Sequence, residues 1–341
     1  MEPELSGRIR ISPEDFYVRE IPSYPFSGSG EYLILKIRRK ELNTKDVQSM
    51  LAKLFNSDES AIGYAGLKDR NAVCEQNFSI RGWAKKSDGE IQSILQRTDE
   101  LELLDIHRHQ NGLRRGHLSG NHFSIAVRSI QGPGDLRSEL NAALQRLQSK
   151  GIVNLYGQQR FGNEGSTLAQ GFQYLEGKKG RKWMLDLGMN AVQSYVFNHY
   201  LRIRNEQGSL FALIDGDLAV TPNGGIFKVP QASAEQERMQ NLEISYTGPI
   251  FGKKMRKPEE PSLTLENRAL EFAGLSADDF GRMKMEGARR AGIVFPANIT
   301  MAWESEDSVR LDFSLPSGSY ATVALGHLFN INHDGTDIQT L

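Results

Sequence analysis

The periodicity of the apolar residues changes near residue 157, and this change limits the possible folds more than any other feature of the sequence. Before it, segments such as Leu33 to Ile37 alternate apolar and polar residues, as strands with one buried face do. Beyond it helical spacing dominates, as in the stripe Val192, Tyr195, Val196, Tyr200 and Ile203. Alternation returns at Val309 to Phe313. We therefore expect an α+β protein with a mixed sheet built from residues 1–156 and 296–341, interrupted by a helix-rich insertion of residues 157–295.

Length and composition agree with an ordinary globular protein. The chain has 341 residues, 39% of them hydrophobic, which is enough for two domains with normal cores. Its single cysteine, Cys74, excludes an internal disulfide and fits a reducing compartment, and its alternating neighbours favour a buried side chain over a reactive thiol. The N-terminus has no apolar signal core, and no apolar run is long enough for a membrane helix. We expect a soluble, cytoplasmic protein.

Positive charge is concentrated in four places although the net charge is only -1. They are KIRRK at 36–40, a segment with Arg108, Arg114 and Arg115, KKGRK at 178–182 and KKMRK at 253–257. Such clusters can follow a phosphate backbone even when the total charge is close to neutral. Any one of these runs is more typical of a solvated face or loop, and the four together raise the case for nucleic-acid binding only modestly.

The segment from Gly63 to Gln76 holds the most distinctive acid of the chain. Its pattern predicts a strand, a polar turn with Asp69 near the tip, and a second strand. An aspartate in a turn is usually a solvated turn residue. The cations Lys68 and Arg70 on either side also fit a carboxylate that stays ionised and acts as a nucleophile. The segment by itself does not decide between these roles.

Common catalytic and cofactor motifs are missing from the sequence. The stretch at 171–179, GFQYLEGKK, has the wrong spacing for a phosphate-binding loop and lacks the following Ser or Thr. There is no HExxH motif, no Gly-x-Ser-x-Gly elbow and no dinucleotide fingerprint after a strand. His107 and His109 would share one face of a strand, where a structural or RNA-facing role is favoured over metal binding. We expect chemistry without metal or cofactor.

Five separated segments resemble, in the same order, the TruD family of tRNA pseudouridine synthases. They are Pro13–Val18, Gly63–Gln76, Gly120–Phe123, Asn154–Gly162 and Leu315–Thr322, and the helix-like stretch Asn190–Asn198 resembles the inserted domain of the family. The resemblance implies a mixed, mainly antiparallel pseudouridine synthase catalytic domain, residues 1–156 and 296–341. It also implies an inserted helix-rich α/β TRUD domain, residues 157–295.

The resemblance further implies an activity, a substrate and a set of site residues. A uridine in the D arm of tRNA, at position 13, would be flipped out and isomerised to pseudouridine with no cofactor and no metal. Asp69 would be the catalytic carboxylate. Lys68 and Arg70 would bind substrate and keep this carboxylate ionised, with Arg70 or a basic loop contacting phosphate. Phe16, Phe123 and Tyr320 would supply stacking or shape, and Asn121 would bond the uracil edge or a ribose hydroxyl.

Several alternatives remain at this stage. The family often carries Phe where this chain has Tyr320, which leaves the role of the hydroxyl open. Phe123 also fits ordinary core packing, and Asn121 also fits a turn after Gly120. The substrate could be an RNA other than tRNA. A non-catalytic RNA-binding or tRNA-chaperone protein would also explain the basic runs.

Overall fold

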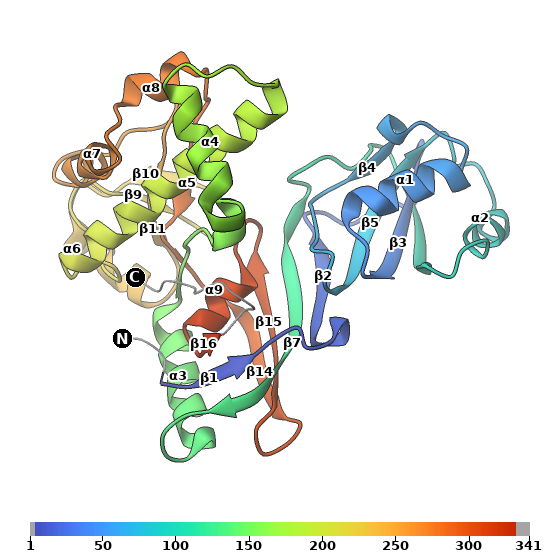
Figure 1. Cartoon of the computed structure of the whole chain (residues 1–341), viewed down its shortest axis with the longest axis horizontal. Helices are drawn as coiled ribbons and strands as arrows, with labels where there is room; N and C mark the ends of the chain where they lie inside the picture. The colour runs from blue at the N-terminus through green and yellow to red at the C-terminus, as the bar shows by residue number, and fades with distance from the viewer. Residues whose placement is uncertain (1–3, 332–341) are drawn as a thin grey trace. The chain divides into compact units, whose positions relative to one another are not determined.

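The computed structural model describes residues 4–331. These residues form two compact units, each assembled from separate stretches of the chain (Figure 1). Unit 2 contains Gly7–Gln131 and Pro296–Gly318. Unit 1 contains Gly132–Phe295 together with the residues before Gly7 and after Gly318. Segments far apart in the sequence therefore complete both units.

Unit 2 is built mainly of strands. Its strands are β2 (Phe16–Pro22), β3 (Tyr32–Lys40), β4 (Ile62–Tyr64), β5 (Val73–Arg81), β6 (Leu101–His109), β7 (Leu118–Gln131), β14 (Ala297–Trp303) and β15 (Val309–Pro316), and its helices are α1 (Thr44–Leu54) and α2 (Asp88–Leu95). The short strand β1 (Ser6–Arg8) begins at the boundary of the unit.

The strands of unit 2 form one sheet in the order β14-β15-β7-β2-β5-β3-β6, with β4 beside β5. Every neighbouring pair is antiparallel except β2 and β5, which run parallel over residues 17–19 and 73–75. The C-terminal strand β15 pairs with β7 along eight residues, from Val309 opposite Val127 to Pro316 opposite Gly120. Strands β15 and β14, from the C-terminal part of the chain, therefore form one edge of the sheet.

Two helices cover part of one face of this sheet. Val47 and Leu51 of α1 and Ile91 and Leu95 of α2 share a buried cluster with strand residues such as Leu35. The helix α1 begins at Thr44, and its N-cap is Asn43, whose side chain accepts the N–H groups of Lys45 and Asp46. The Thr44 hydroxyl does not cap the helix and instead accepts the N–H of Lys68.

Unit 1 is rich in helices. Its elements are α3 (Leu136–Lys150), β8 (Ile152–Val153), α4 (Ser166–Leu175), α5 (Lys182–Glu206), β9 (Leu218–Val220), β10 (Ile226–Lys228), α6 (Ala232–Gln240), β11 (Ser245–Ile250), α7 (Ser262–Phe272), α8 (Ala277–Arg282), β12 (Ala288–Ala291), β13 (Ile293–Val294), α9 (Ala321–Gly326) and β16 (Asn330–Ile331). The long helix α5 passes through the core, where Val192, Val196 and Tyr200 are fully buried. A small sheet, β10-β9-β11-β12, packs beside it.

A charged network is enclosed in unit 1. Arg204 of α5 is fully buried and forms an ion pair of 2.9 Å with the fully buried Asp217. The hydroxyl of Ser262 donates to the same carboxylate, and Arg289 pairs with the buried Glu266 at 2.6 Å. A buried charge is tolerated only when it is paired and hydrogen-bonded. This network therefore holds α5, α7 and the small sheet in one arrangement.

The predicted fold class, a mixed and mainly antiparallel α+β protein with a helix-rich part, is confirmed. The compact units group residues 132–156 with the helix-rich segment, whereas the family resemblance assigns these residues to the catalytic domain. The predicted catalytic domain and insertion, with limits at 157 and 295, stay a prediction.

Within the described residues, no helix is both long enough and apolar enough to cross a membrane.

Candidate active site

Asp69 lies in the connection between β4 and β5, in unit 2. Its carboxylate projects to the surface with 47% of the side chain exposed, and it receives one ion pair, from Arg10 Nη2 to Oδ2 at 2.7 Å. The neighbouring Leu67 is 60% exposed, although it is a large apolar residue. The connection therefore presents an acid and an apolar side chain together to the solvent.

The backbone under Asp69 is held by buried polar side chains. Arg39 donates from Nη1 to the carbonyl of Asp69 (3.0 Å) and from Nη2 to the carbonyl of Lys68 (3.3 Å). The Thr44 hydroxyl accepts the N–H of Lys68 (2.9 Å), and Gln76 Nε2 donates to the carbonyl of Gly66 (2.6 Å). Fixed backbone under an exposed carboxylate is what a positioned catalytic group requires.

Lys68 points away from the Asp69 carboxylate. Its Nζ forms an ion pair of 2.9 Å with Glu20, and the two side chains are only 4% and 2% exposed. Asn77 also donates to Glu20, at 3.5 Å. The structure therefore gives Lys68 a buried partner on β2, and its predicted contact with substrate stays a prediction.

Arg70 is exposed, and its Nε donates to the carbonyl of Glu41 (3.0 Å). Cys74, on β5, is fully buried, as predicted. Its thiol lies 3.7 Å from the carbonyl oxygen of Asp69. Burial raises the pKa of this thiol to about 11, so it stays protonated at neutral pH. Cys74 is therefore part of the support for the loop and no nucleophile.

Arg10 is the site residue that the sequence did not reveal. Its guanidinium carbon lies 4.1 Å from the centre of the Phe16 ring, and its backbone has a positive φ of 59°. Among the described residues, its buried Nε has no hydrogen-bond partner. Arg10 thus contacts both the Asp69 carboxylate and the Phe16 ring. Asp69 lies far from Arg10 in the sequence.

Phe16 and Phe123 belong to a buried aromatic row on the sheet. The rings of Phe16 and Phe123 meet edge to face with centres 6.3 Å apart, and Phe123 stacks on Phe313 at 5.5 Å. Phe16 is 2% and Phe123 is 6% exposed. Both side chains therefore pack in the core of unit 2, and their predicted stacking on a base stays a prediction.

Asn121 lies on β7 opposite Glu20 of β2 and Leu315 of β15. Its Oδ1 is buried, and within residues 4–331 it has no hydrogen-bond partner. Gly120 beside it allows close packing, because a Cβ there would lie 2.3 Å from the carbonyl oxygen of Leu315. A buried amide oxygen left unpaired costs free energy unless a ligand supplies a donor. This observation favours the binding role over the turn role.

Tyr320 lies in unit 1, at the N-terminal end of α9. Its ring meets Tyr156 edge to face at 6.2 Å, and the Arg290 guanidinium lies 4.0 Å from the Tyr156 ring centre. Arg290 is held in turn by Asn154, to which Nη2 donates at 2.6 Å. The structure links Asp69 through Arg10 to Phe16 and Phe123 in unit 2. Asn121 lies in the same unit, and Tyr320 lies in unit 1.

The basic segment before β7 adjoins the Asp69 connection. The N–H of Gly116 donates to the carbonyl of Ala65 (2.9 Å), which fixes the exposed Arg114 and Arg115 next to this connection. Nearby, His109 stacks on Tyr24 at 5.1 Å and His107 packs against Phe26 at 5.3 Å. Among the described residues no group of three or more His, Cys, Asp or Glu side chains could hold a metal ion.

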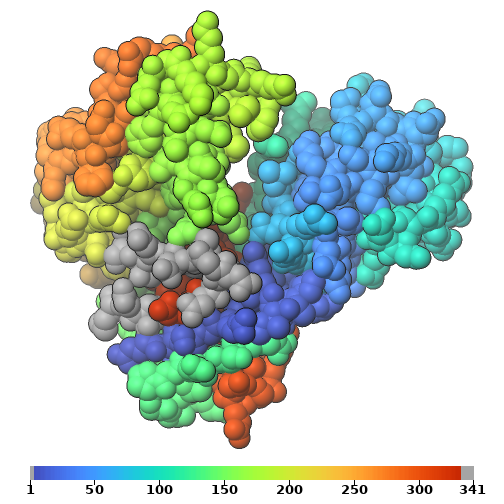
Figure 2. Space-filling model, in the orientation of Figure 1, coloured from blue at the N-terminus to red at the C-terminus, as the bar shows by residue number. Residues whose placement is uncertain are grey.

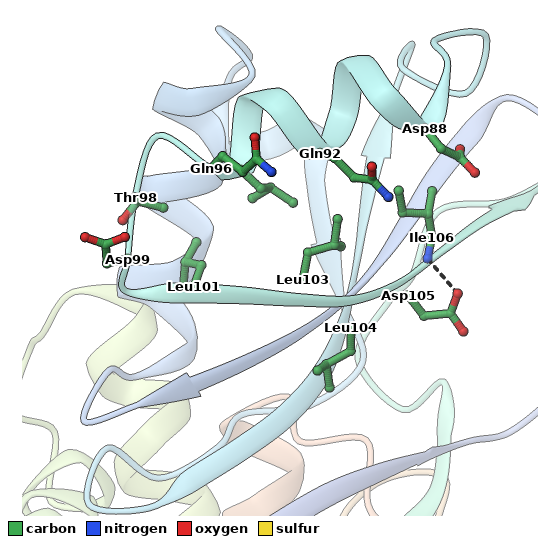
Figure 3. Close-up of a pocket in the computed structure, with 11 residues that line it drawn as sticks. Asp88, Gln92, Gln96, Thr98, Asp99, Leu101, Leu103, Leu104, Asp105 and Ile106 are labelled. Atoms are coloured by element: carbon green, nitrogen blue, oxygen red, sulfur yellow. Dashed lines mark hydrogen bonds between the residues drawn. The ribbon is translucent and has the colours of Figure 1, made fainter.

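A pocket of about 610 Å³ lies elsewhere in unit 2, between α2 and β6 (Figure 3). Leu101 and Leu103 point from the strand toward α2, Asp88 and Asp99 lie at opposite ends of the pocket, and the Asp105 carboxylate points to the other side of the strand. Asp69 is not among its lining residues. We therefore assign the candidate site to the Asp69 connection and not to this pocket.

The arrangement around Asp69 fits one kind of chemistry. A fixed, exposed carboxylate beside a guanidinium can add to an electrophilic carbon or accept a proton. An unpaired amide and cationic side chains in the same unit can bond a base edge and phosphates. The site thus combines an acid–base or nucleophilic group with groups that suit a nucleotide.

Comparisons with known proteins cover nearly the whole chain. The family model described as "tRNA pseudouridine synthase D (TruD)" matches residues 1–181 and 181–327. The tRNA pseudouridine synthase D of Anaeromyxobacter sp. (strain Fw109-5) is 36% identical over 96% of this chain and 93% of its own length. One from Thermus thermophilus is also 36% identical, over 96% of this chain and 90% of its own length.

A solved structure supports the same fold. A crystal structure from Methanosarcina mazei, provisionally described as a tRNA pseudouridine synthase D (TruD), superposes with a TM-score of 0.72. It covers 97% of this chain and 95% of its own chain at 22% sequence identity, so the likeness concerns the fold alone.

Proposed function

The chain belongs to the tRNA pseudouridine synthase D (TruD) family, and from this premise we propose that it isomerises uridine 13 in the D arm of tRNA with Asp69 as its catalytic carboxylate. The chain is accordingly a pseudouridine synthase, an isomerase. The observation that carries the proposed role of Asp69 is its geometry, an exposed carboxylate on a backbone fixed by Arg39, Thr44 and Gln76.

The reaction conserves every atom of the nucleotide. The bond between N1 of uracil and C1′ of ribose breaks, the base rotates, and C5 bonds to C1′; the proton lost from C5 is balanced by one gained at N1. Asp69 serves this sequence in one of two ways, by adding to the base or sugar or by taking a proton from the ribose. Both ways require the ionised carboxylate, whose negative charge the Arg10 cation stabilises at 2.7 Å.

The target uridine must leave its stack to reach Asp69, since a base inside folded RNA is inaccessible to a side chain. We assign its recognition to the unpaired Oδ1 of Asn121, which would accept a hydrogen bond from the uracil N3–H or a ribose hydroxyl. Phe16 and Phe123 would shape the floor of this site, and Lys68 would support the Asp69 connection through Glu20. Tyr320, in unit 1, would offer an aromatic face to the RNA. Arg70 and the segment with Arg114 and Arg115 would contact phosphates.

Replacing Asp69 separates catalysis from binding. We expect Asp69→Asn to abolish conversion of an unmodified tRNA transcript, because an amide neither adds to carbon nor accepts the proton, while tRNA affinity stays within a few-fold. The matched control is Asp99→Asn, an exposed aspartate of the same unit that lines the pocket between α2 and β6. Pseudouridine is measured by carbodiimide modification and primer extension, and affinity by filter binding.

Three outcomes would decide between the candidate functions. Conversion retained by Asp69→Asn would contradict the assignment of the carboxylate. Tight tRNA binding with no conversion by the unaltered chain would favour the non-catalytic RNA-binding alternative. Mapping pseudouridine in RNA from cells lacking the gene tests the target, and a loss at a site other than tRNA position 13 would contradict the proposed substrate.

A further inference from the structure

The connection between α4 and α5 in unit 1, together with the first residues of α5, forms an exposed basic surface that contains a tryptophan. The residues from 176 to 183 are all exposed, and they include Lys178, Lys179, Arg181, Lys182 and Trp183, which we call the 178–183 patch. Trp183 is 61% exposed, and Leu187, one helical turn further, is 44% exposed. The space-filling view shows the yellow-green atoms of this region uncovered on the surface (Figure 2).

The cations of this patch differ from most of those in KIRRK and from Lys254 in KKMRK, which have a carboxylate partner. In KIRRK, Lys36 and Arg38 pair with Glu75, and Lys40 pairs with Glu14. In KKMRK, Lys254 pairs with Glu286. In the 178–183 patch the one side-chain bond to another residue is from Lys178 Nζ to the neutral Gln173 (2.7 Å), and none of its cations pairs with a carboxylate in residues 4–331.

The patch is held in place by close packing behind it. The helices α4 and α5 cross at two glycines, where a Cβ on Gly171 would lie 2.4 Å from the carbonyl oxygen of Gly188. Gly180 packs directly on the ring of the buried Tyr174, since a Cβ there would lie 2.8 Å from that ring. The four cations and the indole are therefore displayed from a fixed support, which lowers the entropy cost of binding a ligand.

We propose that the 178–183 patch is an RNA-binding surface, with the cations on successive phosphates and Trp183 stacked on an unpaired base of the same RNA. Unpaired cations gain most from phosphates, because binding releases the condensed counterions of the nucleic acid. An exposed indole stacks on any base, and its apolar face is covered in doing so. The inference rests on the proposed function only in naming tRNA as the RNA.

An anionic lipid surface is a less suitable partner. Helices that lie in a membrane interface bury a continuous apolar face opposite their charges. Here the exposed apolar side chains are Trp183 and Leu187, on a segment whose other exposed residues from 176 to 182 are charged or glycine. Vesicle binding is nonetheless measured as one outcome below.

The first experiment measures the salt dependence of binding. A variant with Lys179→Gln, Arg181→Gln and Lys182→Gln is compared with a control of equal charge, Lys86→Gln, Lys228→Gln and Arg282→Gln, in which each cation is exposed and already paired with a carboxylate. All proteins also carry Asp69→Asn, so that binding is read without turnover. The probe is an unmodified tRNA transcript at salt concentrations from about 50 to about 300 mM.

We expect the patch variant to reduce the slope of log affinity against log salt by about two to three, because each lost phosphate contact removes close to one. The control should leave the slope unchanged. Equal slopes for the patch variant and the parent, or equal losses in patch variant and control, would overturn the proposal. The proposal would also be overturned if the patch variant lost binding to vesicles that contain phosphatidylserine but bound tRNA as the parent does.

The second experiment tests the indole. We expect Trp183→Ala to weaken tRNA binding about fivefold or more, and Trp183→Phe to recover most of the loss, since base–aromatic stacking depends on a ring. tRNA should quench the tryptophan fluorescence of the parent far more than that of Trp183→Phe. Undiminished affinity of Trp183→Ala, or equal quenching in both proteins, would overturn the role of Trp183.

Failure of this inference can be told from failure of the proposed function. Normal conversion of uridine 13 with no effect of either set of variants would remove the patch proposal and leave the enzyme assignment intact. If the patch variants weakened tRNA binding but the unaltered chain converted no uridine, the patch proposal would stand and the proposed reaction would be contradicted.

Discussion

At the scale of single residues, the Asp69 carboxylate depends on Arg10 for its position. Arg10 binds it at 2.7 Å and stacks over Phe16 at 4.1 Å, so the guanidinium links the acid to the buried aromatic row. Asp69 is nearly half exposed, and without this contact its side chain would rotate freely in solvent. The proposed catalytic geometry therefore includes a residue outside the sequence motif that contains Asp69.

We expect Arg10→Gln to lower kcat for pseudouridine formation by about 100-fold, the size of effect that a small misplacement of a reacting group produces. The KM for tRNA should change much less, and Arg10→Lys should recover part of kcat. Steady-state kinetics with a tRNA transcript measures both constants. Arg8→Gln, at an exposed position two residues earlier, is the control. A larger effect on KM than on kcat would instead assign Arg10 to RNA binding.

Local sequence indicated the acid but not its surroundings. Lys68 and Arg70 flank Asp69 in the chain, yet the structure turns Lys68 to Glu20 and Arg70 to the carbonyl of Glu41. The cation at the carboxylate, Arg10, is 59 residues away in sequence. Such contacts are decided by how β2, β3 and β5 assemble, and spacing within one segment carries no information about them.

At the scale of elements, three strands of unit 2 are tied together by Glu75. It lies on β5, next to Cys74, and side chains alternate along a strand, so Glu75 faces away from the Asp69 connection. Its side chain is 5% exposed and pairs with Lys36 (2.9 Å) and Arg38 (2.8 Å) of β3. Burial alone would raise the pKa of Glu75, but hydrogen bonds from Lys36, Tyr17 and Arg38 outweigh it and lower the pKa to about 2.

This shift predicts how the stability of unit 2 varies with pH. The pKa of Glu75 is lower in the folded than in the unfolded chain, so its contribution is complete above about pH 4.5 and is lost as the pH falls toward 2. We expect Glu75→Gln to lower the free energy of unfolding by about 3 kcal/mol at pH 7 and by progressively less below pH 4.5. Urea unfolding from pH 7 to 3 measures the difference.

The control for this prediction is Glu102→Gln, because Glu102 also bonds Arg38 but is 56% exposed. Exposed pairs contribute little, so this variant should change the free energy of unfolding by less than about 1 kcal/mol at any pH. A constant difference between the Glu75→Gln and unaltered chains across the acid range would show that Glu75 is not the titrating group.

Element types were more predictable than element ends. Alternation at Leu33 to Ile37 and at Val309 to Phe313 correctly indicated β3 and β15. Phe123, Ile125 and Val127 also alternate, but β7 runs much further, from Leu118 to Gln131, because it pairs with β2 on one side and β15 on the other. Tertiary pairing, which one sequence does not display, sets these limits.

At the scale of the whole molecule, neither compact unit is continuous in sequence. The chain passes between the units after Ser6, Gln131, Phe295 and Gly318. The C-terminal residues supply β14 and β15 to unit 2 and the buried side chains of α9, such as Val323 and Ala324, to unit 1. Each unit therefore needs residues from the C-terminal part of the chain to complete its fold.

A chain that ends at Phe295 tests this dependence. It would expose the edge of β7 that β15 pairs along eight residues, and it would uncover the surface beneath α9. Because an uncovered strand edge and apolar surface promote aggregation, we expect a largely insoluble product with no cooperative thermal transition. Sedimentation measures the soluble fraction of the shortened chain, and circular dichroism of that fraction measures its helix content and thermal transition. A sharp transition with native helix content would contradict the dependence.

The pairing of β15 with β7 also sets the time at which the enzyme can first act. During translation, β7 leaves the ribosome long before β15, and at about 5–20 residues per second the synthesis of the residues between them takes roughly 10 to 35 s. During that interval Phe123 lacks Phe313, and Asn121 lacks its neighbour Leu315. The proposed site is therefore unfinished until β15 has been synthesised and has paired with β7, so a nascent chain that stops before β15 carries no complete site.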